Sequence, residues 1–515
     1  MEKEYILSLN NISNLKTIFK NKNIVAYGNG SFYNRIKKHL DLFNLKFFDT
    51  LYTKNDQIVS MSGKSYEEIV QNSIVLICSS FHKDIIKILI NQEQKPKDIK
   101  IASFLINSNE ELKIYNQELL KVIQIQHNKI LKNLKAKEKI KVVFLAIHKS
   151  VWKVDPVFKK MMADPYFEPM ILVCPYTVYG EERMWEDMKD TYEYFEEKGY
   201  PIISSYNKDE DRWISLEEIK PDIVFFTNPH NLTRKEYYED AYMNYLSCYV
   251  PYYTDIASNY DIQSVYNQTF HNVVWKIFLQ SEYSVNRAKE ISLNKGYNIE
   301  LSGNLIHEMF QNLLEKNIKN PWKQQTKTKK RIIYAPHQSI LLENNLHLGT
   351  FLKNGEAIKN LAIKYRDVIQ WAFKPHPILK SKLYIHPEWG KKRTDGYYEF
   401  WQNSEYTQLE LGEYIELFAT SDAIIHDCGS FIDEYLLVEK PCGYLYFNGE
   451  NQLKAINSYG KELLKKYNIL SSEKDIENFI ENIIKDDIKG HEFIKNKINP
   501  SSFILTHLKE AIRSE

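Results

Sequence analysis

The sequence has few glycines, few prolines and very little arginine for a chain of 515 residues. It contains 17 glycines and 16 prolines, and only nine of its 68 basic residues are arginine. So little Gly and Pro excludes collagen-like and low-complexity disordered chains. Cysteine is also rare, with five residues at positions 78, 174, 248, 428 and 442 and no Cys-x-x-Cys pair. This spacing is typical of reduced thiols and excludes a disulfide framework or a Cys-based zinc site.

Long apolar runs and an excess of charge are missing as well. Apolar runs such as residues 74–78 and 223–226 are far shorter than the ~20 residues of a membrane span. The first residues show no basic segment followed by an apolar one, so we expect a cytoplasmic protein without a secretory signal. The net charge of +1 gives no electrostatic case for nucleic acid. No paired-aspartate motif stands out, and we expect neither a metal nor a required cofactor.

What is present is the composition of a globular protein, 43% hydrophobic and 26% charged, in which apolar runs alternate with helical patterns. This alternation predicts an α/β fold with parallel, doubly wound sheets. The predicted strands form three groups: residues 24–27, 46–48, 73–78 and 99–105; then 141–147, 169–174, 201–204, 222–227, 249–253, 273–280 and 299–302; then 331–335, 368–374, 423–426 and 442–447.

Two segments separate these groups. Residues 109–139 carry apolar side chains at alternating spacings of three and four, without Gly or Pro, which predicts a long helix. Residues 316–331 form a Lys-rich linker. We therefore predict a Rossmann-like accessory module (1–108), a connecting helix (109–139), two further Rossmann-like domains (140–315 and 325–500) and a C-terminal helix (501–515). The last three parts resemble the layout of GT-B transferases, in which ligands bind beyond the carboxyl ends of the strands, between the two domains.

The most informative segment is SDAIIHDCGSFIDEYLLVEKPCGYLY, residues 421–446. A short strand is followed by the turn DCGS and by a predicted helix over 431–438. Gly429 allows a phosphate to approach the backbone, the helix start offers free N–H groups, and Ser430 adds a hydroxyl donor. Glu434, one turn into the helix, is placed to accept hydrogen bonds from ribose hydroxyls. An ordinary turn capped by Asp427 or Ser430 has the same pattern.

Two earlier strands of the same domain also end in polar groups. WAFKPHP, residues 371–377, places Lys374 and His376 in a loop stiffened by two prolines. A Lys beside a fixed His suits a pyrophosphate, because the Lys is a point charge and the imidazole donates a hydrogen bond or a proton. RIIYAPHQS, residues 331–339, ends in His337, Gln338 and Ser339. Each segment alone also fits a solvated loop or a packed histidine, but three such strand ends predict a phosphate site.

In these segments the chain resembles the bacterial CDP-glycerol glycerophosphotransferase family, the GT-B-type polymerases and primases of teichoic acid and capsule. That family has a strand ending Tyr-Ala-Pro, a basic–His-Pro segment and an Asp-x-Ser-Ser turn. The matching stretches here are Tyr334-Ala335-Pro336, His376-Pro377 and Asp427-Cys428-Gly429-Ser430, with Ser302-Gly303-Asn304 at a Gly-containing turn before the donor domain. The resemblance covers about residues 140–490. It implies that His376 and Ser430 contact the phosphates of the donor.

The chain departs from that family on the acceptor side. The family has a His-Gly-Thr segment after a strand, and its His is the expected general base. The matching stretch here is CYVPYYTD, residues 248–255, which has no His-Gly. The catalytic base is therefore Asp255, the nearby His271, or absent. The transferred group stays open among glycerol phosphate, ribitol phosphate and a sugar.

The N-terminal module has a nucleotide-loop pattern of its own. Gly28-Asn29-Gly30 follows a strand and opens a predicted helix, and Asp49 lies about 20 residues further on, as in dinucleotide sites. The third glycine of that motif is missing. A structural turn in an accessory domain is the more common origin of a lone Gly-x-Gly.

The leading functional hypothesis is a transferase that moves a glycerophosphate-type unit from a CDP-linked donor substrate to a surface-glycan or lipid-linked acceptor. The alternatives are a GT-B glycosyltransferase that uses a nucleotide sugar, an NAD-linked or sugar-modifying enzyme acting through the N-terminal module, and a non-catalytic scaffold. The expected partners are the nucleotide-activated donor and the acceptor, with no nucleic acid; a homo-oligomer is left open.

A location at the inner membrane face follows from the lysines. Residues 121–141 and 316–331 together carry fourteen basic residues and one acidic residue. Lys residues near an anionic leaflet gain ~1 kcal/mol each, so a peripheral, salt-sensitive association is expected. Solvated faces of a helix and a linker in a Lys-rich protein have the same composition.

Overall fold

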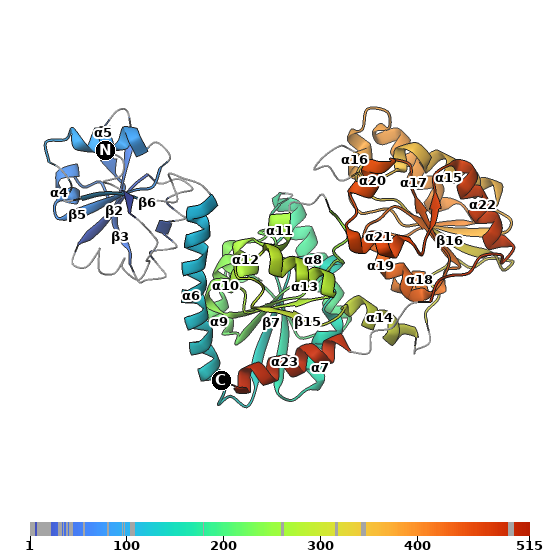
Figure 1. Ribbon diagram of the computed structural model, residues 1–515, viewed down its shortest axis with the longest axis horizontal. Coiled ribbons are helices and arrows are strands. Elements are labelled where there is room, and N and C mark those ends of the chain that lie inside the picture. The colour runs from blue at the N-terminus through green and yellow to red at the C-terminus, as the bar shows by residue number, and fades with distance from the viewer. Residues whose placement is uncertain are drawn as a thin grey trace. The chain divides into compact units, whose positions relative to one another are not determined.

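The computed structural model describes residues 6–7, 22–28, 33, 36–37, 40, 45–54, 57–79, 82–94, 96, 98–102, 109–178, 180–258, 262–314, 318–340, 347–492 and 499–514. The chain divides into two compact units, Met1–Ile125 and Gln126–Glu515 (Figure 1). The division falls inside helix α6 (Asn109–Leu134), the long helix predicted from the apolar stripe. Each unit is built on parallel β-sheets.

The first unit contains one sheet of strand order β1-β6-β5-β2-β3-β4. Neighbouring strands are parallel, except that β4 runs antiparallel to β3. The central strand β5 has all five side chains buried, as expected for a strand covered on both faces. The elements are β1 (Ile6–Leu7), β2 (Asn23–Tyr27), β3 (Phe47–Lys54), β4 (Gln57–Ser60), α4 (Tyr66–Val70), β5 (Ser73–Ile77), α5 (His82–Ile90) and β6 (Asp98–Ala102).

One strand of this unit is longer than its predicted range of residues 46–48. Strand β3 continues to Lys54, and the chain then turns back as β4 along the sheet edge. The mixed polar and β-branched residues of 50–54 gave no apolar run, although Thr, Tyr and Leu all fit a half-buried edge hairpin. Most of the helix predicted after Gly28 lies outside the described residues.

The second unit begins with a seven-stranded sheet of order β15-β14-β13-β12-β7-β8-β9, parallel throughout. We call residues 140–314 the seven-stranded domain. Its strands are β7 (Ile140–Ala146), β8 (Phe167–Val173), β9 (Ile202–Ser204), β12 (Ile223–Phe226), β13 (Leu246–Tyr249), β14 (Lys276–Leu279) and β15 (Ile299–Leu301). A small hairpin, β10 (Tyr206–Asn207) with β11 (Arg212–Trp213), lies apart from this sheet.

Helices connect the strands of the seven-stranded domain. They are α7 (Asp155–Ala163), α8 (Glu181–Glu197), α9 (Leu216–Ile219), α10 (Glu239–Asn244), α11 (Ile262–Tyr266), α12 (Thr269–Val273), α13 (Glu282–Ile291) and α14 (Leu305–Leu314), with the 3₁₀ turns η3 (Lys149–Val151) and η4 (Lys235–Tyr237). The strand predicted over residues 249–253 is wrong in position. The paired strand β13 ends at Tyr249, so the following residues form a loop at the carboxyl edge of the sheet.

A second parallel sheet, of order β18-β17-β16-β19-β20-β21, forms what we call the six-stranded domain, residues 330–484. Its strands are β16 (Lys330–Ala335), β17 (Ile369–Phe373), β18 (Thr407–Leu409), β19 (Ala423–His426), β20 (Cys442–Leu445) and β21 (Asn468–Leu470). The two edge strands β18 and β21 have only three residues each, too short for an apolar pattern, and were not predicted.

The helices of the six-stranded domain are α15 (Phe351–Lys364), α16 (Leu379–Ile385), α17 (Gly390–Asn403), α18 (Ile415–Thr420), α19 (Phe431–Glu434), α20 (Glu450–Lys454), α21 (Ser458–Leu464) and α22 (Glu473–Ile484). The helix predicted over residues 431–438 is a single α-helical turn, α19, followed by the 3₁₀ segment η6 (Tyr435–Val438). Two sheets of this kind confirm the predicted α/β, Rossmann-like fold class.

The last helix, α23 (Pro500–Ser514), returns to the seven-stranded domain and lies beside α7 (Figure 1). Its buried face, made by Ile504, Leu505, Leu508 and Ile512, belongs to the core of that domain. Helix α6 contributes Leu131 and Leu134 to the same core. The five cysteines are buried and unpaired, and none of the described helices combines the length and the apolar character needed to cross a bilayer.

We expect that Leu508→Ala lowers the free energy of unfolding by about 2–5 kcal/mol, because it opens a cavity in the core of the seven-stranded domain. Urea unfolding followed by circular dichroism measures this. The exposed neighbour Thr506 provides the control, and Thr506→Ala should change stability by less than about 0.5 kcal/mol. Equal effects of the two substitutions would show that α23 is not part of this core.

Candidate functional site

Three predicted phosphate-competent segments meet at one edge of the six-stranded domain. They follow β17, β16 and β19, which are neighbours in the sheet, so their carboxyl ends lie side by side. The N–H of His376 donates to the carbonyl of Pro336 at 3.0 Å. The ring centroids of His337 and His376 are 5.3 Å apart. The structure therefore brings the ends of RIIYAPHQS and WAFKPHP into contact.

Asp427 joins this pair to the third strand end. Its fully buried carboxylate accepts hydrogen bonds from the N–H of His337 (2.6 Å) and from the N–H and hydroxyl of Thr350 (2.6 and 2.7 Å). Burial raises the pKa of Asp427 to about 6, against the lowering effect of these hydrogen bonds. Because both oxygens are used inside the protein, and a carboxylate repels phosphate, this geometry gives Asp427 the task of positioning the loops. The place of Asp427 in the predicted donor-binding turn stays a prediction.

His337 presents a defined tautomer. Its Nδ1 accepts the N–H of Ser339 at 3.2 Å and lies 2.8 Å from the Ser339 hydroxyl, which in turn accepts the N–H of Gly349 at 2.7 Å. Burial, with smaller contributions from the nearby charges of His376 and Lys382, lowers the pKa of His337 to about 3. A neutral ring that accepts at Nδ1 carries its proton on Nε2. His337 is thus a neutral N–H donor.

His376 has the same tautomer and is also neutral. The N–H of Ile378 donates to its Nδ1 at 3.3 Å, and burial, followed by the charges of Lys382 and Lys374, lowers the pKa of His376 to about 4. The Nε2 of this half-buried ring therefore carries a proton at neutral pH. The two histidines give the strand ends a pair of neutral donors. An oxyanion is stabilised by such preorganised donors.

Gly349 and Thr350 complete this edge and were missed in the sequence. A Cβ on Gly349 would lie 2.9 Å from the carbonyl oxygen of Ser339 and 3.0 Å from that of His337, so no side chain fits. Thr350 binds Asp427, as described above. Neither residue follows a predicted strand, and no local motif connects them with the residues they contact. Gln338, half-buried, has a carbonyl oxygen without a hydrogen-bond partner among the described residues.

A charged cluster lies beside the histidines. Lys374 is buried, donates to the carbonyl of Gly412 at 2.7 Å, and has a pKa that burial lowers to about 8. Its Nζ lies 5.4 Å from the ring centroid of Tyr414, and Nζ of Lys153 lies 4.8 Å from the same centroid. Lys153 follows η3 in the seven-stranded domain. Two ammonium groups, one from each domain, therefore share the Tyr414 ring.

Glu434 lies at the other end of Tyr414. The Tyr414 hydroxyl donates to its Oε2 at 2.5 Å. Burial raises the pKa of Glu434 to about 7, opposed by the charge of Lys153 and by the Tyr414 hydrogen bond. Sequence reasoning predicted Glu434 and Lys374 but missed Tyr414 and Lys153. Lys153 carried a weak signal, since it is a cation a few residues beyond the carboxyl end of strand β7.

Ser430 and Gly429 lie where the sequence placed them, between β19 and α19. The Ser430 side chain makes no capping hydrogen bond to the helix. A Cβ on Gly429 would approach Leu348 to 3.4 Å, an ordinary contact, so the fold itself does not require glycine here. Because α19 is only one turn long, its dipole contributes less to anion binding than the eight-residue helix that was predicted.

The neighbour of Glu434, Asp433, connects the two domains. Its Oδ2 receives His307 Nε2 at 2.9 Å, Asn304 Nδ2 at 3.1 Å and the Thr254 hydroxyl at 3.2 Å. These three partners all belong to the seven-stranded domain. Burial alone would raise the pKa of Asp433, but the His307 charge and the hydrogen bonds hold the pKa below its usual value. Gly303, with φ of +86°, forms the turn that brings Asn304 to this carboxylate.

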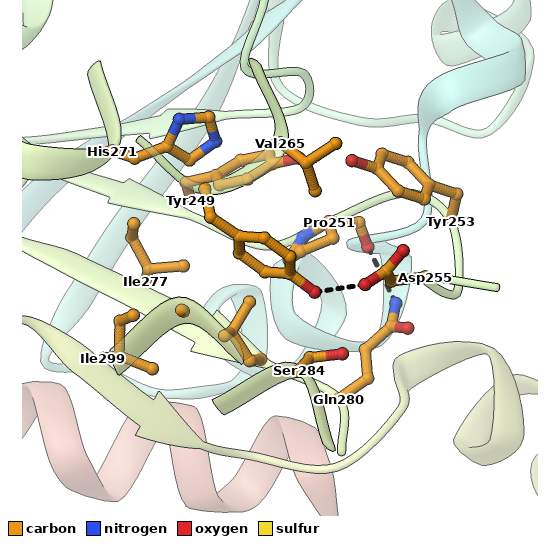
Figure 2. Close-up of a pocket in the computed structure, with 13 residues that line it drawn as sticks. Tyr249, Pro251, Tyr253, Asp255, Val265, His271, Ile277, Gln280, Ser284 and Ile299 are labelled. Carbon is orange, nitrogen blue, oxygen red and sulfur yellow. Dashed lines mark hydrogen bonds between the residues drawn. The ribbon is translucent and has the colours of Figure 1, made fainter. Parts of the chain in front are cut away.

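The two candidates for the base, Asp255 and His271, line one pocket of the seven-stranded domain (Figure 2). The hydroxyl of Tyr266 donates to Oδ2 of Asp255, whose pKa is raised by burial. Burial, with a minor contribution from His230, lowers the pKa of His271 to about 3, so its imidazole is a weak base. Of the two, Asp255 is the better candidate for proton abstraction.

The N-terminal loop is explained in part by the fold. Gly28 has φ of +104°, and a Cβ there would lie 3.0 Å from the carbonyl oxygen of Cys78 on the neighbouring strand end. The carboxylate of Asp49 accepts hydrogen bonds from the N–H of Thr50 and from the hydroxyl of Ser62. Gly30 lies outside the described residues. A nucleotide loop at Gly28 and Gly30 stays a prediction.

Four lysines of the two segments predicted to dock to a membrane contact the protein itself. Lys323 and Lys329 donate to the carbonyls of Gln402 and Arg366, at 2.6 and 2.7 Å, and Lys330 pairs with Asp486. In the other segment, Lys137 pairs with Asp222. These contacts give the lysines structural tasks, and docking to an anionic membrane stays a prediction.

Comparison with known proteins gives fold-level similarities. No family model matches the chain, and no curated protein matches its sequence. UDP-GlcNAc 2-epimerase from Methanocaldococcus jannaschii matches with 16% identity and a TM-score of 0.46 over 72% of this chain and 99% of that chain. The enzyme from Neisseria meningitidis, bound to UDP-GlcNAc, matches with 17% identity and a TM-score of 0.45 over 72% and 100%. A variant of the wall teichoic acid polymerase TagF matches with 13% identity and a TM-score of 0.45 over 78% and 98%. At this level the likeness assigns neither substrate nor reaction.

The opposite pKa shifts of Glu434 and Asp433 give a pH test. A carboxyl whose folded pKa is raised contributes stability below its unfolded pKa and loses it as pH rises through the folded value. We therefore expect Glu434→Gln to leave the free energy of unfolding nearly unchanged at pH 4.5. As the pH rises to 8, the variant should become more stable than the parent by up to about 3 kcal/mol. Urea unfolding across this range measures the difference.

Asp433→Asn provides the contrast. A depressed pKa contributes stability above the unfolded value, near 4, and loses it only below that pH. The Asn variant should therefore be less stable than the parent at pH 5 and at pH 8 alike. A gain in stability for Asp433→Asn at pH 8, or a loss for Glu434→Gln, would contradict these environments.

Proposed function

We propose that the protein is a transferase that moves a glycerophosphate-type, polyol-phosphate unit from a CDP-activated donor to a glycan or lipid-linked acceptor. The observation that carries this proposal is the pair of neutral Nε2–H donors of His337 and His376, held at adjacent strand ends. The donor class comes from the resemblance of the three strand-end segments to the CDP-glycerol family.

In this proposal the donor's diphosphate lies against His337, His376 and Ser430. Lys374 and Lys153 contribute positive charge from the two domains. Because both imidazoles are neutral, hydrogen bonding and charge neutralisation come from separate groups. Glu434 is the candidate for the ribose hydroxyls, and since Tyr414 occupies Oε2, a ribose contact would use Oε1.

The reaction is a displacement at the β-phosphorus of the donor. An acceptor hydroxyl forms a new P–O bond, the bond between the β-phosphorus and the bridging oxygen breaks, and CMP leaves with that electron pair. The hydroxyl proton passes to the Asp255 carboxylate. Phosphoryl transfer depends mainly on positioning and on stabilising the developing charge, which the strand-end donors and the two lysines supply.

A nucleotide panel tests the donor. In a thermal-shift measurement with CDP, UDP, GDP and NAD, CDP should raise the melting temperature most, and CDP-glycerol should then support turnover on a glycan acceptor. Stabilisation by UDP or GDP alone would favour a nucleotide-sugar glycosyltransferase. A response to NAD alone would move the site to the N-terminal module, and no response would favour a non-catalytic scaffold.

We expect His376→Ala and Ser430→Ala each to lower turnover by ~10²–10³ while the protein stays folded, because each removes one preorganised donor to the transferring phosphate. Steady-state kinetics with the stabilising donor measures this.

The chain offers a matched control for His376. His386 is also followed by proline and also accepts the N–H of the second residue after it, at 3.3 Å, but it ends helix α16 instead of a strand. His386→Ala should keep the parent's turnover. If the His376 and His386 variants behave alike, the donor site does not include His376.

A further inference from the structure

The pocket that contains Asp255 and His271 lies at the carboxyl end of β13 and β14 (Figure 2). Neither strand-end histidine, His337 or His376, is among its lining residues. Its walls are largely apolar and include three tyrosine rings. The lining residues are Tyr249, Pro251, Tyr253, Asp255, Val265, Tyr266, His271, Ile277, Leu279, Gln280, Ser284, Ala288 and Ile299. An apolar pocket with a few placed polar groups is the usual form of a small-ligand site.

Two polar side chains in this pocket have unmet hydrogen bonds. His271 is 5% exposed, and neither of its ring nitrogens has a hydrogen-bond partner among the described residues. The hydroxyl of Tyr249, a residue 2% exposed, is in the same state. A buried polar group left unpaired destabilises the fold, and such groups in native proteins call for a ligand or an ordered water. Their concentration in one pocket indicates a bound molecule.

The charge of the lining selects the kind of molecule. Among the described lining residues there is no Lys or Arg, and the carboxylate is Asp255, hydrogen-bonded by Tyr266. The charge of Arg287 reaches Asp255 from outside the lining, but Arg287 is paired with Glu290 at 2.6 Å. A phosphate would therefore lack a counter-charge of its own and would face Asp255, which is unfavourable in a buried site. A neutral ligand is therefore favoured over an anionic one.

The unpaired groups of His271 and Tyr249 also favour a ligand that carries hydroxyl groups. A neutral imidazole offers one donor and one acceptor, and a tyrosine hydroxyl offers both, which matches alcohol groups that are themselves donor and acceptor. Asp255 adds an acceptor. The tyrosine rings suit the apolar C–H face of a sugar or a polyol carbon chain.

The pocket is also tied to the donor site. Thr254, adjacent to Asp255, donates to Asp433 of α19 at 3.2 Å, three residues after Ser430. Two residues after Thr254, the carbonyl of Ile256 accepts the N–H of Asn457 of the six-stranded domain at 2.7 Å. The loop that carries Asp255 is thereby held against α19, the helix that follows Ser430.

We propose that this pocket binds the uncharged terminal unit of the acceptor, a glycosyl ring or polyol whose hydroxyls hydrogen-bond His271, Tyr249 and Asp255. The identity of the bound unit as an acceptor rests on the proposed transferase function, whereas its neutral, hydroxylated chemistry rests on the pocket alone.

The test is binding of neutral and charged probes to the full chain. Isothermal titration and saturation-transfer NMR would use methyl glucoside, methyl N-acetylglucosaminide, glycerol, glycerol 3-phosphate and CDP. At least one neutral probe should bind more tightly than glycerol 3-phosphate. His271→Phe, which removes both nitrogens and keeps a ring, should weaken that probe by about tenfold or more and leave CDP binding unchanged. Tyr249→Phe should weaken it to a smaller extent.

A matched control separates binding from folding. His127 on α6 is also buried, its Nε2 has no hydrogen-bond partner among the described residues, and it does not line the pocket. His127→Phe should therefore leave the affinity for the neutral probe and for CDP unchanged. Without ligand, His271→Phe should be at least as stable as the parent, because it removes unpaired buried groups. Preferred binding of glycerol 3-phosphate, equal neutral-probe affinity in His271→Phe and parent, or no neutral binding to the parent would overturn the pocket inference. Absence of CDP binding alone would overturn the donor proposal and leave the pocket inference standing.

Discussion

The geometry of the second unit depends on the buried carboxylate of Asp433. It receives hydrogen bonds from Thr254, Asn304 and His307 of one domain while sitting on α19 of the other. Removing one partner of such a buried network costs about 3–5 kcal/mol, because the other charge is left uncompensated. Together with the backbone hydrogen bond between Asn457 and Ile256, this side chain holds α19, and with it Ser430 and Glu434, against the loop that carries Asp255.

The same physical effect, burial, acts differently on the two sides of this connection. At the strand ends it keeps His337 and His376 neutral, so they serve as directed donors while Lys374 and Lys153 hold the positive charge. In the pocket it keeps His271 neutral with no lysine nearby among the described lining residues. One surface is therefore suited to an anion and the other to an uncharged polar ligand, which agrees with the proposed transfer between a diphosphate donor and a hydroxylated acceptor.

Much of the site was predictable because strand ends are local features. Apolar runs in the sequence predicted the strands β16, β17 and β19, and the polar residues that follow them could be identified from the sequence as well. Sequence patterns did not indicate the site residues Thr350, Gly349, Tyr414 and Lys153. Thr350 and Lys153 act on residues far away in the sequence, and Gly349 and Tyr414 belong to no motif that connects them with their partners. The turn that contains Asp427 predicts a donor site. In the structure, the carboxylate oxygens of Asp427 accept hydrogen bonds from two loops that no local sequence pattern connects to it.

The α/β class, the order of most strands along the chain and the position of the strand-end histidines follow from the sequence alone, because short-range periodicity and turn chemistry set them. The folded chain was needed to show that burial keeps these histidines neutral, which carboxylates the protein itself holds, and that Asp255 and His271 share a pocket with unpaired polar atoms. The physical reason is that burial, and the hydrogen bonds of Asp427 and Asp433, come from residues distant in the chain that meet only in the packed structure.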